Sequence, residues 1–206
     1  MANIHVDDEI TLRWPVMADA DEMFALIAAN RTYLARWLPW APDHTLETER
    51  QWIEGRMQVK VGGTCSPSLL IYQGSLVGLT GVTNKDPLNK SCTLGYYLAG
   101  AYQGRGIVTR ACRGVLSYAF DTLGMHSVQI SANPANTRRL AIPRRLGFIY
   151  EVTMREVEFL NGRFQDSTSY SMLASEWARL RSMEGEVKRP IGPTVRQALH
   201  DQKRTP

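Results

Sequence analysis

A glycine turn directly in front of the most amphipathic helix of the chain constrains its fold and chemistry most. The turn Gln103-Gly104-Arg105-Gly106 precedes Ile107–Leu123, where apolar residues recur in pairs every four positions, as one buried helix face requires. The free N–H groups and positive dipole end of a helix start favour an anion, and glycines let the backbone approach it. No Ser, Thr, Asp or Asn stands at this helix start to cap it, and a bound anion would explain the omission.

Two other interpretations of the glycine turn compete with anion binding. Glycine is common in ordinary turns before helices, so the segment could be a turn and nothing more. It could also belong to a dinucleotide-binding fingerprint, G-x-G-x-x-G, but Thr109 replaces the third glycine. That fingerprint also sits in an N-terminal strand–helix–strand unit, which the pattern here lacks, so dinucleotide binding is excluded.

The remaining periodicity predicts one α/β domain without internal repeats. Further helices are expected at Asp19–Asn30, from about Thr45 to Val61, at Asn136–Leu146 and, as a last turn or two, at Ser175–Met183. Strands are expected at Glu9–Trp14, Ser68–Tyr72, Leu76–Thr83, Cys92–Ala99, Ser127–Ala132, Gly147–Leu160 and Phe164–Leu173. Gln73-Gly74 and Asn161-Gly162 are typical of tight hairpin turns, and Lys85–Lys90 is expected to be a polar loop.

Composition indicates a globular chain that needs no covalent or metal cross-link. A chain of 206 residues buries enough surface for one core without either. Its 44% hydrophobic and 21% charged residues are ordinary for such a domain. Cys65, Cys92 and Cys112 are odd in number and lack CxxC spacing, so we expect reduced thiols and no metal site.

The two ends of the chain bear on its location and partners. The acidic start has no apolar segment like that of a signal peptide, and no apolar run approaches the length of a membrane span. We therefore expect a cytoplasmic protein without a membrane partner. Gly185–Pro206 holds five basic and two acidic residues, so most of the formal charge of +4 lies there. We expect residues 185–206 to be a mobile basic tail after a domain of residues 1–184, and no nucleic-acid partner.

Four motifs, in order along the chain, resemble those of the GNAT acetyltransferases, and of their Rim-type ribosomal-protein branch in particular. The segment from Tyr102 to Val108 is similar to the family's Q-x-x-G-x-G/A acetyl-CoA motif. Asn133–Asn136 and Arg145–Phe148 follow at the family's spacing. Residues 30–40, with Asn-Arg-Thr-Tyr-Leu and Trp-Leu-Pro-Trp, resemble the start of the Rim-type enzymes. The resemblance covers about residues 8–177 and implies a mixed, mostly antiparallel central sheet with splayed strands and flanking helices.

The resemblance implies where acetyl-CoA binds. The strand Cys92–Ala99 would diverge from its neighbour and pair with the pantetheine arm through the backbone at Tyr97 and Leu98. The Leu98 N–H would polarise the thioester carbonyl and stabilise the oxyanion. The pyrophosphate would be held by Gln103, Gly104, Arg105, Gly106, Ile107 and Val108. Asn136 would bind near the pantetheine or its sulfur, and it could also cap the helix that follows.

The resemblance also implies residues on the acceptor side. Glu158 matches the Rim-type glutamate proposed as general base, although a strand glutamate is often simply solvent-facing. An α-amine has a pKa of about 7.7–8.0, so a modest base suffices to deprotonate it. Aromatic side chains give rigid contact area, and we assign Tyr33 and Trp40 to the acceptor pocket, with core packing as the alternative.

Two departures from the family concern the leaving thiolate. Arg139 stands where Rim-type enzymes have a serine, and Pro143 stands where many other members have a tyrosine, so both usual proton donors are absent. Arginine is always charged and cannot donate a proton here. Arg139 is therefore expected to bind a CoA phosphate or to stabilise the thiolate, unless it is a solvated helix arginine.

These residues together favour an N-acetyltransferase. We expect it to move an acetyl group from acetyl-CoA to a primary amine, a protein N-terminus or a small molecule, by direct attack in a ternary complex. A homodimer is an open possibility. The alternative, which the missing proton donors at Arg139 and Pro143 suggest, is an acyl-CoA-binding module with little or no catalysis.

Overall fold

The computed structural model describes residues 3–57 and 66–187. The chain divides into two compact units, Met1–Leu173 and Ala174–Pro206, and the second begins with α6 (Ala174–Val187). Most of the expected tail lies at 188–206, outside the described residues, so the boundary after residue 184 stays a prediction. No helix in the described ranges is long and apolar enough to cross a membrane.

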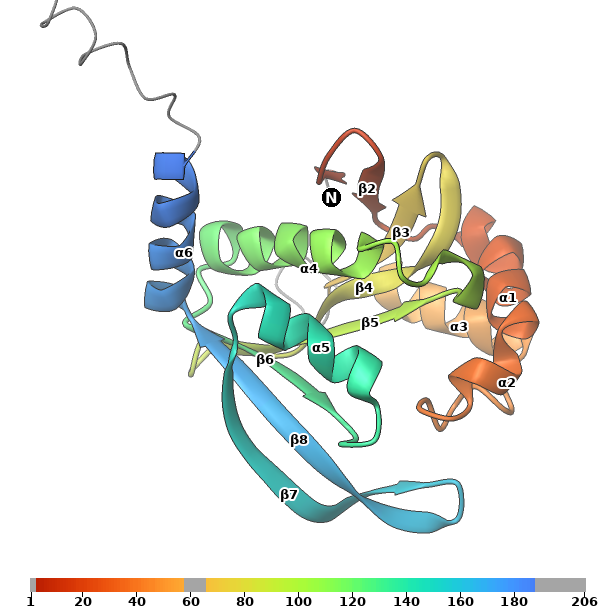
Figure 1. The fold of residues 1–206 in the computed structure, drawn as a ribbon. Helices are drawn as coiled ribbons and strands as arrows, with labels where there is room; N and C mark the ends of the chain where they lie inside the picture. Colours follow the sequence, from red (N-terminus) through yellow and green to blue (C-terminus); the bar gives the residue numbers. More distant parts are fainter. Residues whose placement is uncertain (1–2, 58–65, 188–206) are drawn as a thin grey trace, which may run out of the picture. The chain divides into compact units, whose positions relative to one another are not determined.

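The first unit is built on one eight-stranded sheet in the order β1-β2-β3-β4-β5-β6-β8-β7 (Figure 1). Every neighbouring pair is antiparallel except β5 and β6, which confirms the expected mixed, mostly antiparallel sheet. The strands are β1 (Ile4–His5), β2 (Ile10–Arg13), β3 (Ser66–Tyr72), β4 (Ser75–Asp86), β5 (Ser91–Leu98), β6 (Ser127–Ala132), β7 (Ile149–Leu160) and β8 (Arg163–Leu173).

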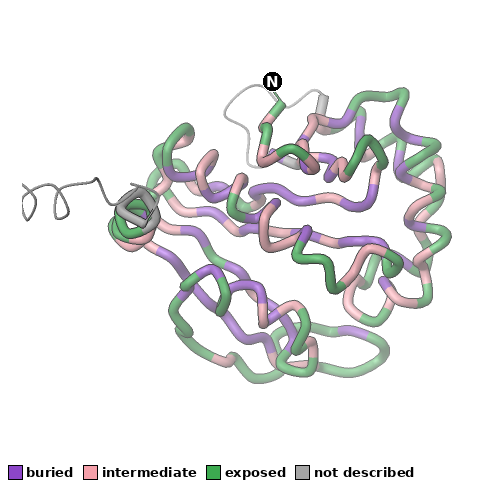
Figure 2. The backbone as a smooth tube through the Cα atoms, turned by 45° about the horizontal axis from the view of Figure 1, so that its top comes forward, coloured by how far each residue is buried: buried purple, intermediate pink, exposed green. Residues whose placement is uncertain are grey.

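Helices cover both faces of this sheet. On one face, α1 (Ala20–Ala29) and α3 (Leu46–Met57) bury Met23 and Ile53 against Leu69 of β3. On the other, α4 (Ile107–Ser117) packs on β2, where a Cβ added at Gly114 would lie 3.7 Å from Leu12 of that strand. The remaining helices are α2 (Arg31–Leu34) and α5 (Thr137–Leu146). The buried stretches accordingly follow the central strands and the inner sides of the helices (Figure 2).

The start of α3 agrees with the prediction from local sequence, whereas the end of α4 differs from it. Thr45 and Thr48 cap α3 reciprocally, each hydroxyl accepting a hydrogen bond from the other's backbone N–H, at 3.1 and 2.9 Å. The end expected near Val61 lies outside the described residues. The helix predicted to reach Leu123 is α-helical to Ser117 and continues as a single π-turn, η3 (Tyr118–Thr122).

The parallel pair β5 and β6 diverges after three residues. Ser91–Thr93 pairs with Ser127–Gln129, and the rest of the two strands run apart, as the resemblance implied. α4 follows β5 after a short turn and crosses back to β6, so its N-terminus lies at the end of β5 where the strands have separated (Figure 1). The divergence therefore places unpaired strand backbone next to a helix start.

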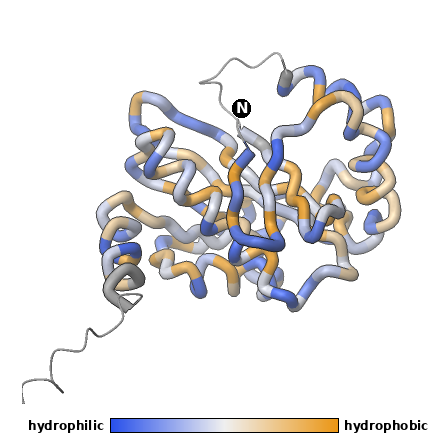
Figure 3. Tube along the Cα trace, turned by 90° about the horizontal axis from the view of Figure 1, so that it is seen from above, coloured by the Kyte–Doolittle hydropathy of each residue, from blue (hydrophilic) through white to orange (hydrophobic). Residues whose placement is uncertain are grey.

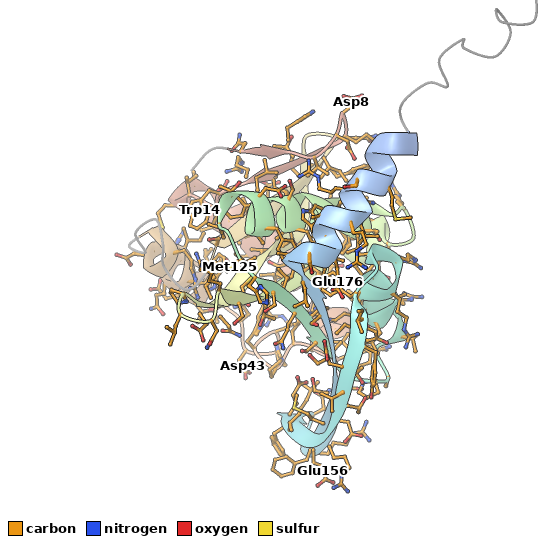
Figure 4. All side chains as sticks on the ribbon, turned by 90° about the vertical axis from the view of Figure 1, so that its left-hand side faces the viewer. Asp8, Trp14, Asp43, Met125, Glu156 and Glu176 are labelled. Carbon is orange, nitrogen blue, oxygen red and sulfur yellow. The ribbon has the colours of Figure 1, made fainter. Side chains whose placement is uncertain are left out.

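The outer strands form a long hairpin that exposes apolar side chains. Glu156, at a bulge with φ 53°, lies near the far end of this hairpin (Figure 4). Hydrophobic and hydrophilic stretches are interspersed along the chain when it is seen from above (Figure 3). Strand β7 leaves several large apolar side chains exposed, namely Ile149, Tyr150, Val152, Met154, Val157 and Phe159.

Gly78 of β4 generates a prediction about the sheet, because β4 and β5 approach each other unusually closely there. A Cβ at Gly78 would lie 2.2 Å from the carbonyl oxygen of Tyr97 and 3.0 Å from Cα of Leu98. Gly78→Ala should lower the free energy of unfolding by about 1–3 kcal/mol, the usual cost of overpacking, in urea denaturation. Gly95→Ala is the matched control, because its Cβ would meet nothing within 4 Å. Equal stabilities of the two variants would contradict the close approach.

Candidate active site

A cavity of about 760 Å³ opens where β5 and β6 diverge, next to the start of α4. It is large enough for a sizeable ligand. Of the residues predicted to bind acetyl-CoA, those that line it are Tyr97, Leu98, Gln103, Gly104, Gly106, Ile107, Val108, Asn136 and Arg139. The side chain of Arg105 instead lies over the Tyr102 ring at 5.3 Å and donates to the Ala101 carbonyl at 3.2 Å.

The glycine turn has the geometry of an anion cradle. Gly104 and Gly106 have φ values of 78° and 72°, in the left-handed region that glycine adopts without strain. Gly106 is the N-cap of α4, and no side chain caps the helix. A Cβ at either glycine would meet nothing within 4 Å, so the space above the turn is open. The uncapped N-terminus and this open space fit the pyrophosphate of a coenzyme A molecule.

Two arginines near the cradle differ in their partners: Arg110 pairs with carboxylates, and Arg138 bonds to a neutral amide. Arg110 pairs with Asp7 at 2.9 Å and with Glu9 at 2.8 Å. The hydrogen bond from Arg110 lowers the pKa of the Glu9 carboxyl. Arg138 also lines the cavity and donates to Gln103 Oε1 at 2.7 Å. This hydrogen bond joins two segments that are 35 residues apart in the sequence, so local spacing does not reveal it.

Asn136 and Arg139 act together at the start of α5. Asn136 Oδ1 accepts a hydrogen bond from the Arg139 backbone N–H at 3.1 Å, so it caps the helix while lining the cavity. The Arg139 guanidinium donates to the carbonyl oxygens of Tyr96 at 2.9 Å and Ser131 at 3.2 Å. It also lies 4.5 Å from the centre of the Tyr96 ring. Arg139 thus bridges the two diverging strands and is not a solvated helix arginine, while its predicted role toward acetyl-CoA stays a prediction.

A second cavity, of about 540 Å³, is lined by β4, β5 and the α1–α3 side of the sheet. Leu38, Tyr96, Tyr97 and Arg139 line both cavities, so the two are neighbours across the end of β5. The two aromatic residues that were predicted to bind the acceptor line different cavities. Tyr33 lines the first cavity, and Trp40 lines the second, where it contacts Tyr97 edge-on at 6.0 Å between ring centres.

A buried carboxylate faces the second cavity. Glu49, in the first turn of α3, is 2% exposed, and its Oε2 lies 2.6 Å from Nε2 of His44. Burial raises the pKa of the Glu49 carboxyl, and the hydrogen bond from His44 offsets part of that shift. Burial, followed by the negative charge of Glu49, also raises the pKa of the Tyr97 hydroxyl. The sequence analysis did not single out Glu49 as a site residue.

The Rim-like segment around residues 30–40 anchors this arrangement. Arg31 donates to the carbonyl oxygens of Ala41 at 3.0 Å and His44 at 2.8 Å, and also to that of Pro42. These bonds fix the loop that carries Trp40 and His44. Asn30 Oδ1 accepts from the Gly100 N–H at 2.8 Å, which ties the end of α1 to the turn after β5.

Glu158 lies apart from this arrangement. It is exposed on β7, where Ser167 Oγ donates to its Oε1 at 3.1 Å. It lines neither of the two cavities described above. Its role as general base stays a prediction that rests on the resemblance.

The described cysteines are unsuited to nucleophilic chemistry. Burial raises the pKa of the Cys92 thiol to about 11 and that of the Cys112 thiol to about 12. Both thiols are therefore protonated near neutral pH, and a protonated thiol is a poor nucleophile. Cys65 lies outside the described residues.

Comparison with known proteins agrees with this geometry. The family model described as acetyltransferase (GNAT) domain matches residues 9–149. A putative ribosomal N-acetyltransferase of Bacillus subtilis, YdaF, is 34% identical over 180 residues, which cover 86% of this chain and 98% of that protein. A ribosomal-protein-serine acetyltransferase of Escherichia coli is 24% identical over 171 residues, covering 82% and 96%. The solved structure of the microcin C7 self-immunity acetyltransferase MccE, in complex with acetyl-CoA and AMP, has a TM-score of 0.76 at 28% identity, covering 82% of this chain and 94% of that one.

The cradle geometry generates a prediction about ligand binding. Gly106→Ala should weaken acetyl-CoA binding at least tenfold in isothermal titration, about 1.4 kcal/mol. The added methyl group would occupy the open space above the turn and strain a residue whose φ is 72°.

A control variant separates the effect of backbone strain on stability from the loss of contact with acetyl-CoA. Gly124→Ala introduces a methyl group at φ 63°, beyond the opposite end of α4, where the added Cβ also meets nothing within 4 Å. It should cost similar stability and leave acetyl-CoA affinity unchanged. If the two variants bind acetyl-CoA equally well, the turn is not the cradle.

Proposed function

Because this chain belongs to the GNAT family of acetyltransferases and is an acetyl-CoA-dependent N-acetyltransferase, we propose that it acetylates the α-amine at a protein N-terminus. In this proposal the amine attacks the acetyl group directly, with both substrates bound at once. The observation that carries it is the pair of neighbouring cavities that share Tyr96, Tyr97 and Arg139 at the end of β5.

The shared wall supports transfer without a covalent enzyme intermediate. One cavity offers an anion cradle, and the other offers a carboxylate and aromatic rings. An amine bound in the second cavity could thereby reach an acetyl thioester bound in the first cavity, across the end of β5. The protonated state of Cys92 and Cys112 argues against acyl transfer through either thiol.

The chain's own residues supply positioning and electrostatics. Bound acetyl-CoA supplies an activated acetyl thioester. The start of α4 and the glycine turn bind its pyrophosphate, and the backbone N–H of Leu98 is proposed to stabilise negative charge on the carbonyl oxygen. The fixed charge of Arg139 between the diverging strands is proposed to stabilise the departing sulfur, since the family's proton donors are absent.

The names of two relatives support a protein α-amine as the acceptor. One is called a putative ribosomal N-acetyltransferase and the other a ribosomal-protein-serine acetyltransferase. The general-base role that the resemblance implies for Glu158 stays a prediction, and the kinetic experiment below measures it against a glutamate of the second cavity. A homodimer and a cytoplasmic location likewise stay predictions, and the exposed apolar residues along the edge strand β7 support the first.

The proposal predicts thiol release that depends on a free N-terminus. Wild-type protein with acetyl-CoA and short peptides should release coenzyme A thiol in step with peptide acetylation, followed by thiol assay and mass spectrometry. Peptides with a blocked N-terminus and no lysine should release none. Initial rates with both substrates varied should give intersecting lines, as direct transfer in a ternary complex requires.

The alternative function makes the opposite prediction. An acyl-CoA-binding module would bind acetyl-CoA tightly and release no thiol with any peptide or small amine. Parallel lines in the initial-rate plots would contradict direct attack and indicate a covalent intermediate.

A further inference from the structure

The second cavity is lined by one carboxylate, and one oxygen of that carboxylate has no hydrogen-bond donor among the described residues. Of the residues described around this cavity, Glu49 alone carries a carboxylate. His44 engages its Oε2, and no hydrogen bond within the described residues engages its Oε1. A carboxylate that is 2% exposed loses much of its hydration, so an uncompensated oxygen facing a cavity favours a hydrogen-bond donor there.

The structure holds this carboxylate in place by a chain of contacts. Arg31 fixes the His44 carbonyl, and the His44 ring lies between Glu49 Oε2 and Thr48 Oγ1, at 2.6 and 3.3 Å. Thr48 in turn belongs to the cap of α3. Glu49 is therefore oriented by two elements, which a surface glutamate would not need.

The walls around Glu49 indicate what the donor carries. They are aliphatic and aromatic, contributed mainly by Met23, Ile27, Leu79, Trp40, Trp52 and Tyr97. The other charged or titratable groups that face the cavity are His44, Arg56, Tyr96, Tyr97 and Arg139. Arg56 lies over the Trp52 ring at 5.5 Å, and Arg139 is bound to the Tyr96 carbonyl at the boundary with the first cavity. Neither cation pairs with Glu49 within the described residues.

We propose that Glu49, held by His44, receives the acceptor's ammonium group in the second cavity and takes one of its protons, and that the group beside this amine is apolar. This inference rests on the proposed function, and it specifies the acceptor as an amine that is attached to an apolar group. Proton transfer to Glu49 leaves a neutral amine with a free electron pair. As the nitrogen forms the C–N bond, the C–S bond breaks, and the second proton of the amine neutralises the thiolate.

The first experiment measures binding and needs no turnover. Isothermal titration of 2-phenylethylammonium, with saturating coenzyme A, should give binding to the wild type that Glu49→Gln weakens at least tenfold. Affinity for coenzyme A itself should change less than twofold. Neutral 2-phenylethanol should not discriminate between the two proteins. No binding of the ammonium probe to the wild type, or equal affinity for both proteins, would overturn the proposal.

A second variant keeps the test decisive if Glu49→Gln fails to fold. Gly95 faces the same cavity, and a side chain there meets nothing within 4 Å. Valine suits a strand, so Gly95→Val should fold, bind coenzyme A and lose the ammonium probe because its methyl groups fill the cavity. Retained probe binding in Gly95→Val would place the amine elsewhere.

The kinetic arm compares Glu49→Gln with two other glutamates. Glu49→Gln should lower kcat/KM for the peptide by about 10²–10⁴-fold near neutral pH, the range of a general base, and the loss should shrink above the pKa of the amine. Glu47→Gln is the matched control on the same helix, because Glu47 is exposed and contacts Gln51. It should leave kcat/KM unchanged. A hundredfold loss in Glu158→Gln with less than threefold in Glu49→Gln would overturn the proposal in favour of Glu158.

The outcomes also separate this inference from the proposed function. If the wild type releases no thiol with any amine, the proposed acetyl transfer is wrong. The binding of 2-phenylethylammonium then still decides whether Glu49 receives a cation. If the wild type turns over and Glu49→Gln loses activity equally at every pH together with coenzyme A affinity, Glu49 is structural and the inference fails alone.

Discussion

The site depends on one interrupted strand pairing. β5 and β6 begin as a parallel pair at Ser91–Thr93 and then separate, which leaves main-chain carbonyl groups without the partners a continuous sheet would give them. Arg139 supplies part of the compensation by donating to Tyr96 on one strand and Ser131 on the other. One side chain thereby bridges the strands at the gap and places a fixed positive charge where both cavities meet.

The close approach of β4 to β5 fixes the other side of the gap. Gly78 lets the backbone at Tyr97 and Leu98 lie against β4, so the strand that forms the wall between the cavities cannot shift toward β4. The turn after it is tied to α1 through Asn30, and α4 then begins with an uncapped helix end. The cradle and the wall are thus held by contacts outside the glycine motif itself. These contacts explain how a short motif can have a defined geometry in this chain.

The parts of the fold that local sequence determines were predictable. Alternation along β5 and the four-residue recurrence in α4 depend on neighbours in the chain, and so do the turn at Gln73-Gly74 and the cap at Asn136. β1 was not predicted, because two residues are too few to show alternation. The glycine turn before α4 was predictable because its two glycines serve one local backbone conformation.

The acceptor side was predictable only in part, for a physical reason. Trp40, which the sequence analysis assigned to the acceptor pocket, lines a cavity, whereas Glu49 was missed. A glutamate in the first turn of a helix has an ordinary local explanation, and its burial depends on β5 and on a loop fixed by Arg31. Glu158 carried a stronger motif match, yet it lies on the exposed hairpin. Burial of a charge is a property of the assembled fold, so sequence spacing did not reveal it.

The central claim is that acetyl donor and amine acceptor meet across the end of β5, and a bisubstrate complex tests it most directly. A crystal structure with coenzyme A joined through an acetyl bridge to the α-amine of a peptide with an apolar first residue would locate both halves together. The account predicts the pyrophosphate over Gly104 and Gly106, the bridge beside Tyr96 and Tyr97, and the amine within hydrogen-bond distance of Glu49. A peptide half lying along β7 beside Glu158, with the second cavity empty, would contradict it.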